Sequence, residues 1–427
     1  MKLTKPTDSS SININEFDLS NPHLHSEGDV HLIWHAMRER APVHWQDVGN
    51  GLGFWSVTKH NDVVKVLSDH TLFTSERGTL LNLLGIDDPA GGRQMTATDP
   101  PRHTQMRRPI QQGFTQRSLK KHSDVIRKEI RKLLVPAADG EVIDFASAMM
   151  SLSTAVAGTI LGLPESDWPK LTHLTAMAIA PDDTKYLLPQ GTKATLQKAH
   201  REIFAYFEDI IHEKKDWEDD EVLGILLKLN VDGNKMDLGA VLANCYSLLL
   251  GANVTTPHVP SGALYTLMET GGYEDWAIHP ELIPVGVEEA LRWSSPASHF
   301  MRYAIEDVEI RGKQIKKGDA VVAWIGSANR DEEVFKDPFK FDIRRKHNPH
   351  IAFGKGAHYC VGHPAARQTI KILFEELFDN FESFELAGKE EHLASNFIAG
   401  IKNLPVRGYV RKDKSISLSD PITSASK

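Results

Sequence analysis

A cysteine framed by glycines is the residue best placed in this sequence to do chemistry. Residues 353–362 read Phe-Gly-Lys-Gly-Ala-His-Tyr-Cys-Val-Gly, with the cysteine at position 360. Glycines before Cys360 permit positive φ angles and the close approach of a flat ligand. A helix expected over residues 361–380 begins next to the cysteine, so its N–H groups and dipole should lower the thiol pKa. Such a thiolate can bind a soft metal or act as a nucleophile, whereas a free cysteine is more commonly a small buried hydrophobe.

The complete pattern Phe-Gly-x-Gly-x-His-x-Cys-x-Gly resembles the haem-binding loop of the cytochrome P-450 family, the haem-thiolate monooxygenases. The resemblance implies that Cys360 is the axial thiolate ligand of haem b iron and that Phe353 packs beside the sulfur. A thiolate ligand favours O–O cleavage at haem iron. The same resemblance places Gly354, His358 and Gly362 among the residues that bind the cofactor.

A carboxylate and a guanidinium three residues apart form the second match. Glu289 and Arg292 fit the Glu-x-x-Arg pair of this family, and residues at this spacing share one helix face. Most such pairs are solvated surface pairs that contribute under about 1 kcal/mol. Together with Asn-Arg-Asp at 329–331 and Phe-Lys-Asp-Pro at 335–338, however, this pair resembles the network that braces the haem loop. We therefore expect Glu289, Arg292 and Arg330 to be structural.

A helix is expected over residues 101–114, which begin with the second of two adjacent prolines, and one of its faces is basic. His103 and Arg107 stand four residues apart and would offer two donors to a pair of carboxylates, although an ordinary basic face has the same pattern. The resemblance makes them ligands of the haem propionates, together with Arg302 and His358. Pro109 departs from the family pattern and should bend or shorten this helix.

The segment Gly-Ala-Asn-Val-Thr-Thr at 251–256 falls where the family typically has small–Gly–x–acid–Thr–Thr in its central helix. By this resemblance Thr255 takes the position of the oxygen-binding threonine, and the small Ala252 leaves room above the iron. Val254 stands where the acid is usual, and valine cannot relay a proton.

Two prolines suggest how proton delivery could proceed without that acid. Pro257 has no N–H for the carbonyl of Asn253, and Pro260 likewise frees the carbonyl of Thr256. Water held at the Asn253 carbonyl could pass protons together with Thr255; alternatively, both prolines only kink the helix.

The elements that must hold these residues are mainly helical, with a minor β part. A hairpin is expected around Asn50-Gly51, and short alternating runs follow between residues 299 and 324. The resemblance implies a cytochrome P-450 fold, with haem between a long central helix and the helix that follows Cys360. Helical periodicity covers residues 101–114, 118–135, 146–163, 194–212 and 238–269, and the last of these would be about 48 Å long.

Length and composition restrict the class of protein. The chain has 427 residues, a formal net charge of −8 and only two cysteines, Cys245 and Cys360. Two cysteines cannot form a disulfide framework and indicate a reducing compartment, while the acidity argues against nucleic-acid binding. We interpret Cys245 as core packing. We expect one catalytic domain over 25–411, an N-terminal extension over 1–24 and a loose tail over 412–427.

The N-terminus lacks the apolar stretch of a secretory signal, and the apolar segment 241–254 is too short to span a membrane. We therefore expect a cytoplasmic protein, a monomer that binds neither membrane nor nucleic acid.

The regions that contact substrate in this family are mostly apolar here. This composition favours a hydrophobic, mid-sized substrate such as a polyketide, terpenoid, steroid or fatty acyl group. The expected pocket residues are Leu80, Leu81, Leu83, Leu84, Met177, Leu248, Ala252, Ala297, Phe300, Phe397 and Ile398.

No flavin or nicotinamide fingerprint occurs in the chain, so its electrons must come from a partner. The resemblance implies a small acidic ferredoxin and its ferredoxin reductase, and a basic face could dock the ferredoxin. The residues expected to form that face are Arg108, Arg117, Arg344, Arg345, Lys346 and Lys355.

The resulting prediction is a haem-thiolate monooxygenase that uses dioxygen to hydroxylate or epoxidise a hydrophobic small molecule. One alternative is a haem-thiolate enzyme with peroxide-driven or rearrangement chemistry, which stays open because Val254 replaces the usual acid. The other alternative is a haem protein that binds ligands without turnover.

Overall fold

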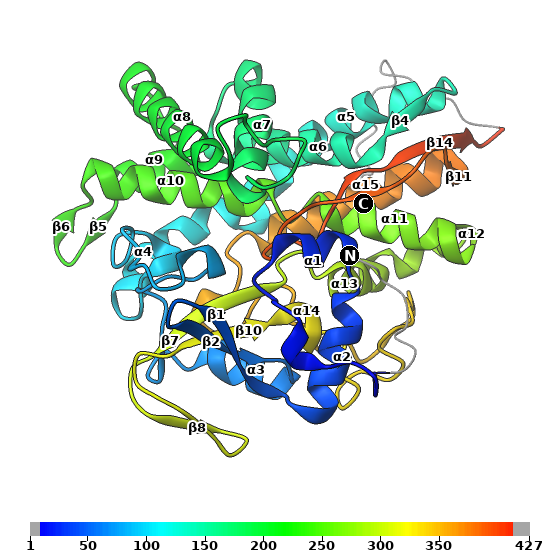
Figure 1. The fold of residues 1–427 in the computed structure, drawn as a ribbon. Helices are drawn as coiled ribbons and strands as arrows, with labels where there is room; N and C mark the ends of the chain where they lie inside the picture. The colour runs from blue at the N-terminus through cyan, green and yellow to red at the C-terminus, as the bar shows by residue number, and fades with distance from the viewer. Residues whose placement is uncertain (1–8, 413–427) are drawn as a thin grey trace.

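The computed structural model describes residues 9–412, and these form a mainly helical fold with a smaller β part. In Figure 1 most of the helices lie above a small region that holds β1, β2, β7 and β10. The helices are α1 Pro22–Glu27, α2 Val30–Arg40, α3 His60–Ser68, α4 Arg102–Ile110, α5 Gln116–Ala138, α6 Phe145–Leu161, α7 Trp168–Ile179, α8 Thr192–Glu213, α9 Val222–Leu227, α10 Leu238–Asn253, α11 His258–Thr270, α12 Tyr273–Ala277, α13 Ile283–Ser294, α14 Ile325–Ala328 and α15 His363–Asn380.

The principal sheet has the strand order β1-β2-β10-β7-β3. The expected hairpin is confirmed: β1 and β2 pair antiparallel around Asn50 and Gly51, whose φ angles are 54° and 74°. The strands are β1 Val43–Gly49, β2 Leu52–Val57, β3 Phe73–Thr74, β4 Val142–Asp144, β5 Asn230–Val231, β6 Asn234–Lys235, β7 His299–Ala304, β8 Val308–Ile310, β9 Lys313–Ile315, β10 Ala320–Trp324, β11 Phe381–Leu386, β12 Glu391–His392, β13 Ile401–Asn403 and β14 Pro405–Val410.

The helix boundaries follow from local chemistry. Side-chain oxygens of Thr115, Asp144 and Asp237 accept backbone N–H groups at the starts of α5, α6 and α10. Gly162 ends α6 with a φ of 80°, a conformation that glycine adopts without strain. The helices expected over 118–135, 146–163 and 194–212 are confirmed to within three residues, whereas α7 was not predicted.

The single helix expected over residues 238–269 is wrong as one continuous element. It ends at Asn253, passes through a turn, and begins again at His258 as α11. The turn contains Pro257, which cannot donate the hydrogen bond that would continue α10. Pro109 acts similarly, because α4 ends one residue later and continues as a 3-10 helix over Gln111–Phe114.

The stretch Leu238–Thr270 is long and apolar enough to pass a composition test for a membrane span, with 39% of its most apolar window buried. Core helices pass the same test. Here α10 packs against α6 and α8, and α11 packs against α13, so we interpret the pair as the centre of the fold.

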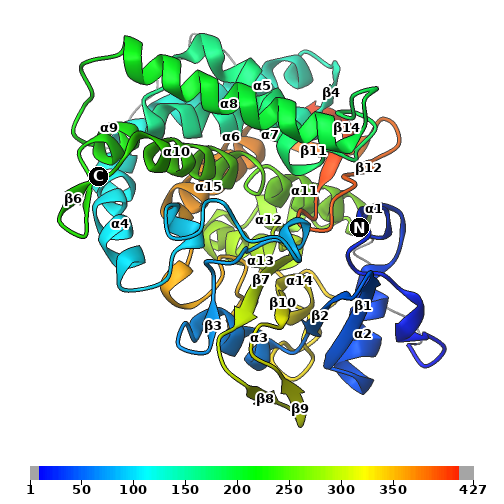
Figure 2. The same ribbon diagram turned by 60° about the vertical axis from the view of Figure 1, so that its left-hand side comes forward.

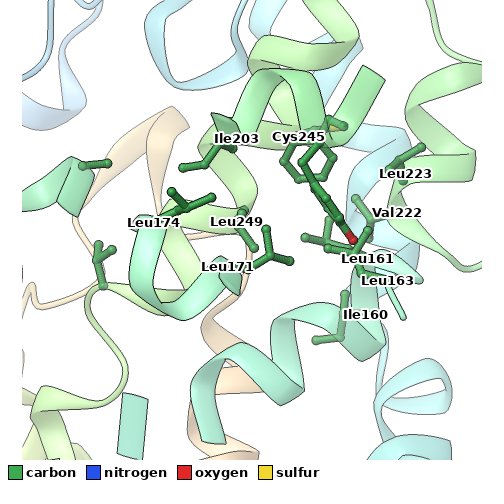
Figure 3. Packing of buried hydrophobic residues seen from close by; sticks show 14 of the residues in the cluster. Ile160, Leu161, Leu163, Leu171, Leu174, Ile203, Val222, Leu223, Cys245 and Leu249 are labelled. Atoms are coloured by element: carbon green, nitrogen blue, oxygen red, sulfur yellow. The ribbon is translucent and has the colours of Figure 1, made fainter. Parts of the chain in front are cut away.

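Buried apolar side chains of α6, α7, α8 and α10 form the cluster drawn in Figure 3. Leu171 and Leu174 of α7 lie near Ile203 of α8 and Leu249 of α10 in this view. Cys245 is fully buried in the same cluster, which confirms its interpretation as core packing, and burial raises its thiol pKa.

Residues 9–24 pack against the rest of the chain. Leu19 is fully buried in a cluster with Trp34 and Trp324, and Asn396 donates a hydrogen bond of 2.6 Å to the carbonyl of Ser20. The division at residue 24 stays a prediction. The expected tail over 412–427 lies outside the described residues except for Lys412.

Candidate active site

The loop before α15 holds Cys360 in a fixed position. The Cys360 N–H donates to the carbonyl of Phe353 at 2.9 Å, which closes the loop on itself. Gly354 and Gly356 have φ angles of 74° and 73°. A Cβ on Gly356 would lie 2.5 Å from the Cα of Ser68 in α3, so only glycine fits there.

The expectation of a lowered thiol pKa at Cys360 is wrong for the free thiol. Burial raises its pKa, and this outweighs the N–H groups of Gly362 and His363 and the charges of Arg107 and Arg367. The helix also begins two residues later than predicted, at His363, so its dipole acts from further away.

Arg367, two turns into the expected helix, braces the loop and was not predicted. Its guanidinium lies 4.5 Å from the centre of the Phe353 ring and binds both carboxylate oxygens of Glu288 at 2.6 and 2.8 Å. Burial alone would raise the pKa of Glu288, but Arg367 and His350 lower it to about 2. No sequence motif marked Glu288, although it precedes Glu289.

Four basic side chains meet beside the cysteine, as the sequence predicted. The rings of His103 and His358 lie 4.3 Å apart, and both nitrogens of the buried His103 lack a hydrogen-bond partner. Arg107 donates to the carbonyl of Tyr359, and Arg302 donates to the carbonyl of Met301 at 2.8 Å. Neither guanidinium has a carboxylate partner within the described residues.

This arrangement disfavours additional positive charge. Burial and the nearby Arg302, His103 and Arg107 lower the pKa of His358 to about 2. Burial and Arg107 lower the pKa of His103 to about 4, and burial lowers that of Arg302 to about 10. A pair of carboxylates would satisfy both the unpartnered nitrogens and the uncompensated charge. The cluster therefore fits the propionates of a haem group.

A cavity of about 840 Å³ opens above the cysteine, and Cys360, His103, Arg107 and His358 form part of its wall. Arg302 and Gly354 are not on that wall. Most of the predicted pocket residues are, namely Leu80, Leu81, Leu83, Leu248, Ala252, Ala297, Phe300 and Phe397.

Three of the predicted pocket residues do not line this cavity, and their role in substrate binding stays a prediction. Ile398 is fully buried and Met177 is 1% exposed, both in the apolar core, because neighbouring elements cover these positions. Leu84 packs with the cluster around Trp34 and, unlike Leu81 and Leu83 of the same cluster, is not on the cavity wall.

Thr255 lies in the turn between α10 and α11 and lines the cavity. Its hydroxyl donates to the carbonyl of Gly251 at 3.0 Å. Val254 also lines the cavity, but the side chain of Asn253 does not; it is buried, and both of its polar atoms lack partners. A role for Asn253 thus rests on its carbonyl alone and stays a prediction.

The pair formed by Glu289 and Arg292 lies wholly inside the protein, in the arrangement expected of a brace. Two hydrogen bonds of 2.7 and 2.8 Å join them, and neither side chain is exposed. Arg292 also donates to the carbonyls of Asn329 and Pro338, each at 2.9 Å. Arg330 donates to the carbonyl of Arg292 at 3.1 Å, so the pair anchors the segments that lead to the Cys360 loop.

Two of the residues expected in a docking face are engaged elsewhere. Arg345 is buried and donates to Glu289 at 3.0 Å, so its assignment to the surface is wrong. Arg344 is exposed but binds Asp275 at 2.5 and 2.8 Å. The four remaining residues are exposed: Arg108, Arg117, Lys346 and Lys355.

Comparison with known proteins assigns the family. Cytochrome P450 NovI of Streptomyces niveus is 32% identical over 408 residues, which cover 95% of this chain and 99% of that protein. The chain belongs to the cytochrome P450 family. The sequence model of that family, Cytochrome P450, matches residues 281–408. Like the family, this P450 is a monooxygenase that binds haem b.

Two further relatives support the assignment. Linalool 8-monooxygenase of Pseudomonas putida is 31% identical over 91% of this chain and 98% of that protein. The crystal structure of P450 OxyD, involved in the biosynthesis of vancomycin-type antibiotics, superposes with a TM-score of 0.81 at 31% identity and covers 92% of this chain and 100% of that chain. The predicted mainly α fold of the P450 family is confirmed.

Proposed function

We propose that this P450 inserts one atom of dioxygen into a C–H or C=C bond of a hydrophobic small molecule of the terpenoid type. The observation that supports this most directly is the apolar cavity that reaches from Cys360 to Thr255. Linalool 8-monooxygenase, a relative over nearly its whole length, carries a terpenoid substrate in its name.

The residues around Cys360 fit the cofactor. Cys360 would hold the iron through its sulfur, and Phe353, Gly354 and Gly362 would shape the loop around it. His103, Arg107, Arg302 and His358 would hold the propionates, because both nitrogens of His103 lack partners and the two guanidinium groups form no ion pair within the described residues. When bound, haem supplies the iron at which dioxygen is activated.

The chain's own groups would hold substrate and proton in place. The apolar walls exclude water and orient the substrate over Cys360. Thr255 offers a hydroxyl on the cavity wall, beside a turn in which Pro257 leaves the Asn253 carbonyl without its helical donor. Thr255 and water at that carbonyl would deliver protons, in place of the acid that Val254 has replaced. Ala252 leaves room beside them.

The electron donor would be a ferredoxin, supplied in turn by a ferredoxin reductase. Arg108, Arg117, Lys346 and Lys355 are exposed and would steer an acidic partner. The absence of a disulfide framework supports a cytoplasmic location, and we propose that the protein acts as a monomer.

Val254 favours a second candidate function, in which peroxide replaces dioxygen and external electrons. The test is product formation by the haem-loaded enzyme with ferredoxin, reductase and NADH, compared with hydrogen peroxide alone. Reductant-dependent oxygenated product supports the first function, and product with peroxide only supports the second. Ligand-induced spectral shifts without any product would contradict both.

The haem ligand is tested separately. The reduced, CO-bound protein should show the red-shifted Soret band of a thiolate ligand, and Cys360→Ser should abolish it. A band that survives this substitution would refute the assignment of Cys360.

A further inference from the structure

Tyr246 and His200 form a polar pair on the cavity wall. Tyr246 lies on α10 and His200 on α8, which pack against each other; Figure 2 shows α8 above α10. Their ring centres are 5.1 Å apart and the ring planes are perpendicular. Phe204, one turn after His200, stacks on Tyr246 with the ring centres 5.4 Å apart. Two residues of α8 thus fix the position of the tyrosine ring.

The hydrogen-bonding groups of this pair are available to a ligand. Within the described residues, neither the Tyr246 hydroxyl nor either His200 nitrogen has a hydrogen-bond partner. Burial raises the pKa of Tyr246 and lowers that of His200, so both are neutral near pH 7. A neutral imidazole can donate or accept, and a phenol donates readily. The pair therefore matches a hydroxyl or carbonyl oxygen.

The charged residues on the cavity wall disfavour a substrate that carries a carboxylate. None of the residues of α8 and α10 that line the cavity is a lysine or an arginine. Elsewhere the cavity wall carries the carboxylates of Asp88 and Asp182, which repel an anion. The guanidinium of Arg107 on this wall lies in the cluster beside Cys360.

Tyr246 also lies well before the turn that holds Thr255. Tyr246 precedes the end of α10 at Asn253 by seven residues, which is about 10 Å of helix rise. Side chains on a helix point toward its N-terminus, which carries the tyrosine hydroxyl further from Thr255. A ligand bound at both places must be elongated.

We propose that Tyr246 and His200 bind the neutral oxygen, a hydroxyl or a ketone, of an elongated apolar substrate and thereby select the carbon that is oxidised. This proposal rests on the proposed monooxygenase function and defines its substrate class. The oxidised carbon lies on the order of 10 Å or more from that oxygen.

The test uses the haem-loaded enzyme and three probes of equal chain length: dodecane, dodecan-1-ol and dodecanoate. The dissociation constant of each comes from the spin-state shift of the iron. The wild type should bind dodecan-1-ol about tenfold more tightly than dodecane, which is about 1.4 kcal/mol, and dodecanoate more weakly than the alcohol.

Tyr246→Phe keeps the stacked ring and removes only the hydroxyl. It should abolish most of the preference for the alcohol and leave the affinity for dodecane unchanged, and His200→Phe should act in the same direction. Tyr409→Phe removes a hydroxyl from an exposed strand and serves as the matched control. Products from dodecan-1-ol should carry the new oxygen toward the far end in the wild type and spread along the chain in Tyr246→Phe.

The outcomes separate the two proposals. Equal loss of alcohol and alkane binding in Tyr246→Phe, an unchanged preference, or tightest binding of dodecanoate would overturn the inference alone. A wild-type enzyme whose spin state shifts with none of the probes would also overturn the inference alone. Spin-state shifts without any oxygenated product would overturn the proposed function and leave the binding inference standing.

Discussion

His103 of α4 and His358 of the Cys360 loop place their rings 4.3 Å apart, although 254 residues separate them in the chain. Burial keeps both rings neutral near pH 7, with Arg107 and Arg302 adding to the effect. Within the described residues, the guanidinium groups of Arg107 and Arg302 beside these rings form no ion pair, and the charge of Asp99 offsets them only in part. Such an anion site is already formed in the protein without its ligand. Removing one of its donors should therefore lower the affinity for the cofactor more than the folding stability.

Removing one donor from this cluster should loosen the haem. Arg107→Leu should lower haem affinity by about 10- to 100-fold, because a charge-assisted hydrogen bond to a buried anion contributes roughly 1.5–3 kcal/mol. The measurement is the rate of haem loss to an excess of a scavenger protein. Arg108→Leu alters the exposed neighbouring residue and should leave this rate unchanged; equal rates for both variants would argue against the propionate site.

The buried carboxylate of Glu289 compensates two guanidinium groups, Arg292 and Arg345. Glu289→Ala should destabilise the protein by about 3–5 kcal/mol, because it leaves buried charge without a partner. The exposed pair of Arg344 and Asp275 provides the comparison, and Asp275→Asn should change stability by under about 1 kcal/mol. Urea unfolding of both variants checks this, and similar midpoints would contradict a bracing role for Glu289.

Proton delivery through Thr255 predicts a change in coupling. Thr255→Ala removes the hydroxyl from the cavity wall and should raise the share of reducing equivalents that is lost as hydrogen peroxide. Thr255→Ser retains a hydroxyl and should restore much of the coupling. The check is the ratio of product to NADH consumed, and a ratio that is the same in all three proteins would rule the role out.

Stability should fall in acid because of buried histidines, of which His25 is a clear case. Burial lowers the pKa of His25 in the folded protein from 6.5 to about 4. Between pH 6.5 and pH 4, His25 is therefore protonated in the unfolded chain and neutral in the folded protein. The free energy of unfolding therefore decreases as the pH falls from about 6.5 to 4, by on the order of 3 kcal/mol from this residue.

His25→Gln keeps an N–H near the carbonyl of Leu19, which His25 contacts at 2.9 Å, and removes the titration. The loss of stability between pH 7 and pH 4.5 should be smaller in this variant than in the wild type. His23→Gln changes an exposed histidine on the same helix. Denaturant titrations at both pH values measure the free energy of unfolding. The same pH dependence in His25→Gln and the wild type would contradict the contribution of His25 to acid destabilisation.

The sequence was sufficient for features that depend on local pattern. The loop around Cys360 and the spacing of Glu289 and Arg292 are short motifs, so their positions in the fold could be predicted. The break after Asn253 was underestimated, because hydropathy continues through Pro257 while the hydrogen-bond ladder does not. The surface position predicted for Arg345 was wrong, because its buried partner Glu289 could not be inferred from the sequence.

The pair of Tyr246 and His200 could not be predicted for a different reason. Each looks like an ordinary helix residue, and only the packing of α8 on α10 brings the two rings together. The one available signal was helical spacing, because the cavity-lining residues Ala243, Tyr246 and Leu250 recur every three or four residues along α10.

The walls of the cavity come from several stretches of chain, and only some of these lie in the region that the family's sequence model matches. Cys360 and Glu289 lie within 281–408, the region matched by the family's sequence model, whereas Tyr246, His200 and Phe204 lie outside it. Exchanging α8 and the first part of α10 between relatives leaves His103, Arg107, Thr255 and Cys360 in place. Such an exchange should alter molecular recognition and preserve the oxidation machinery. After gene duplication, substitutions in α8 and the first part of α10 could change the substrate that is bound while the reaction stays the same.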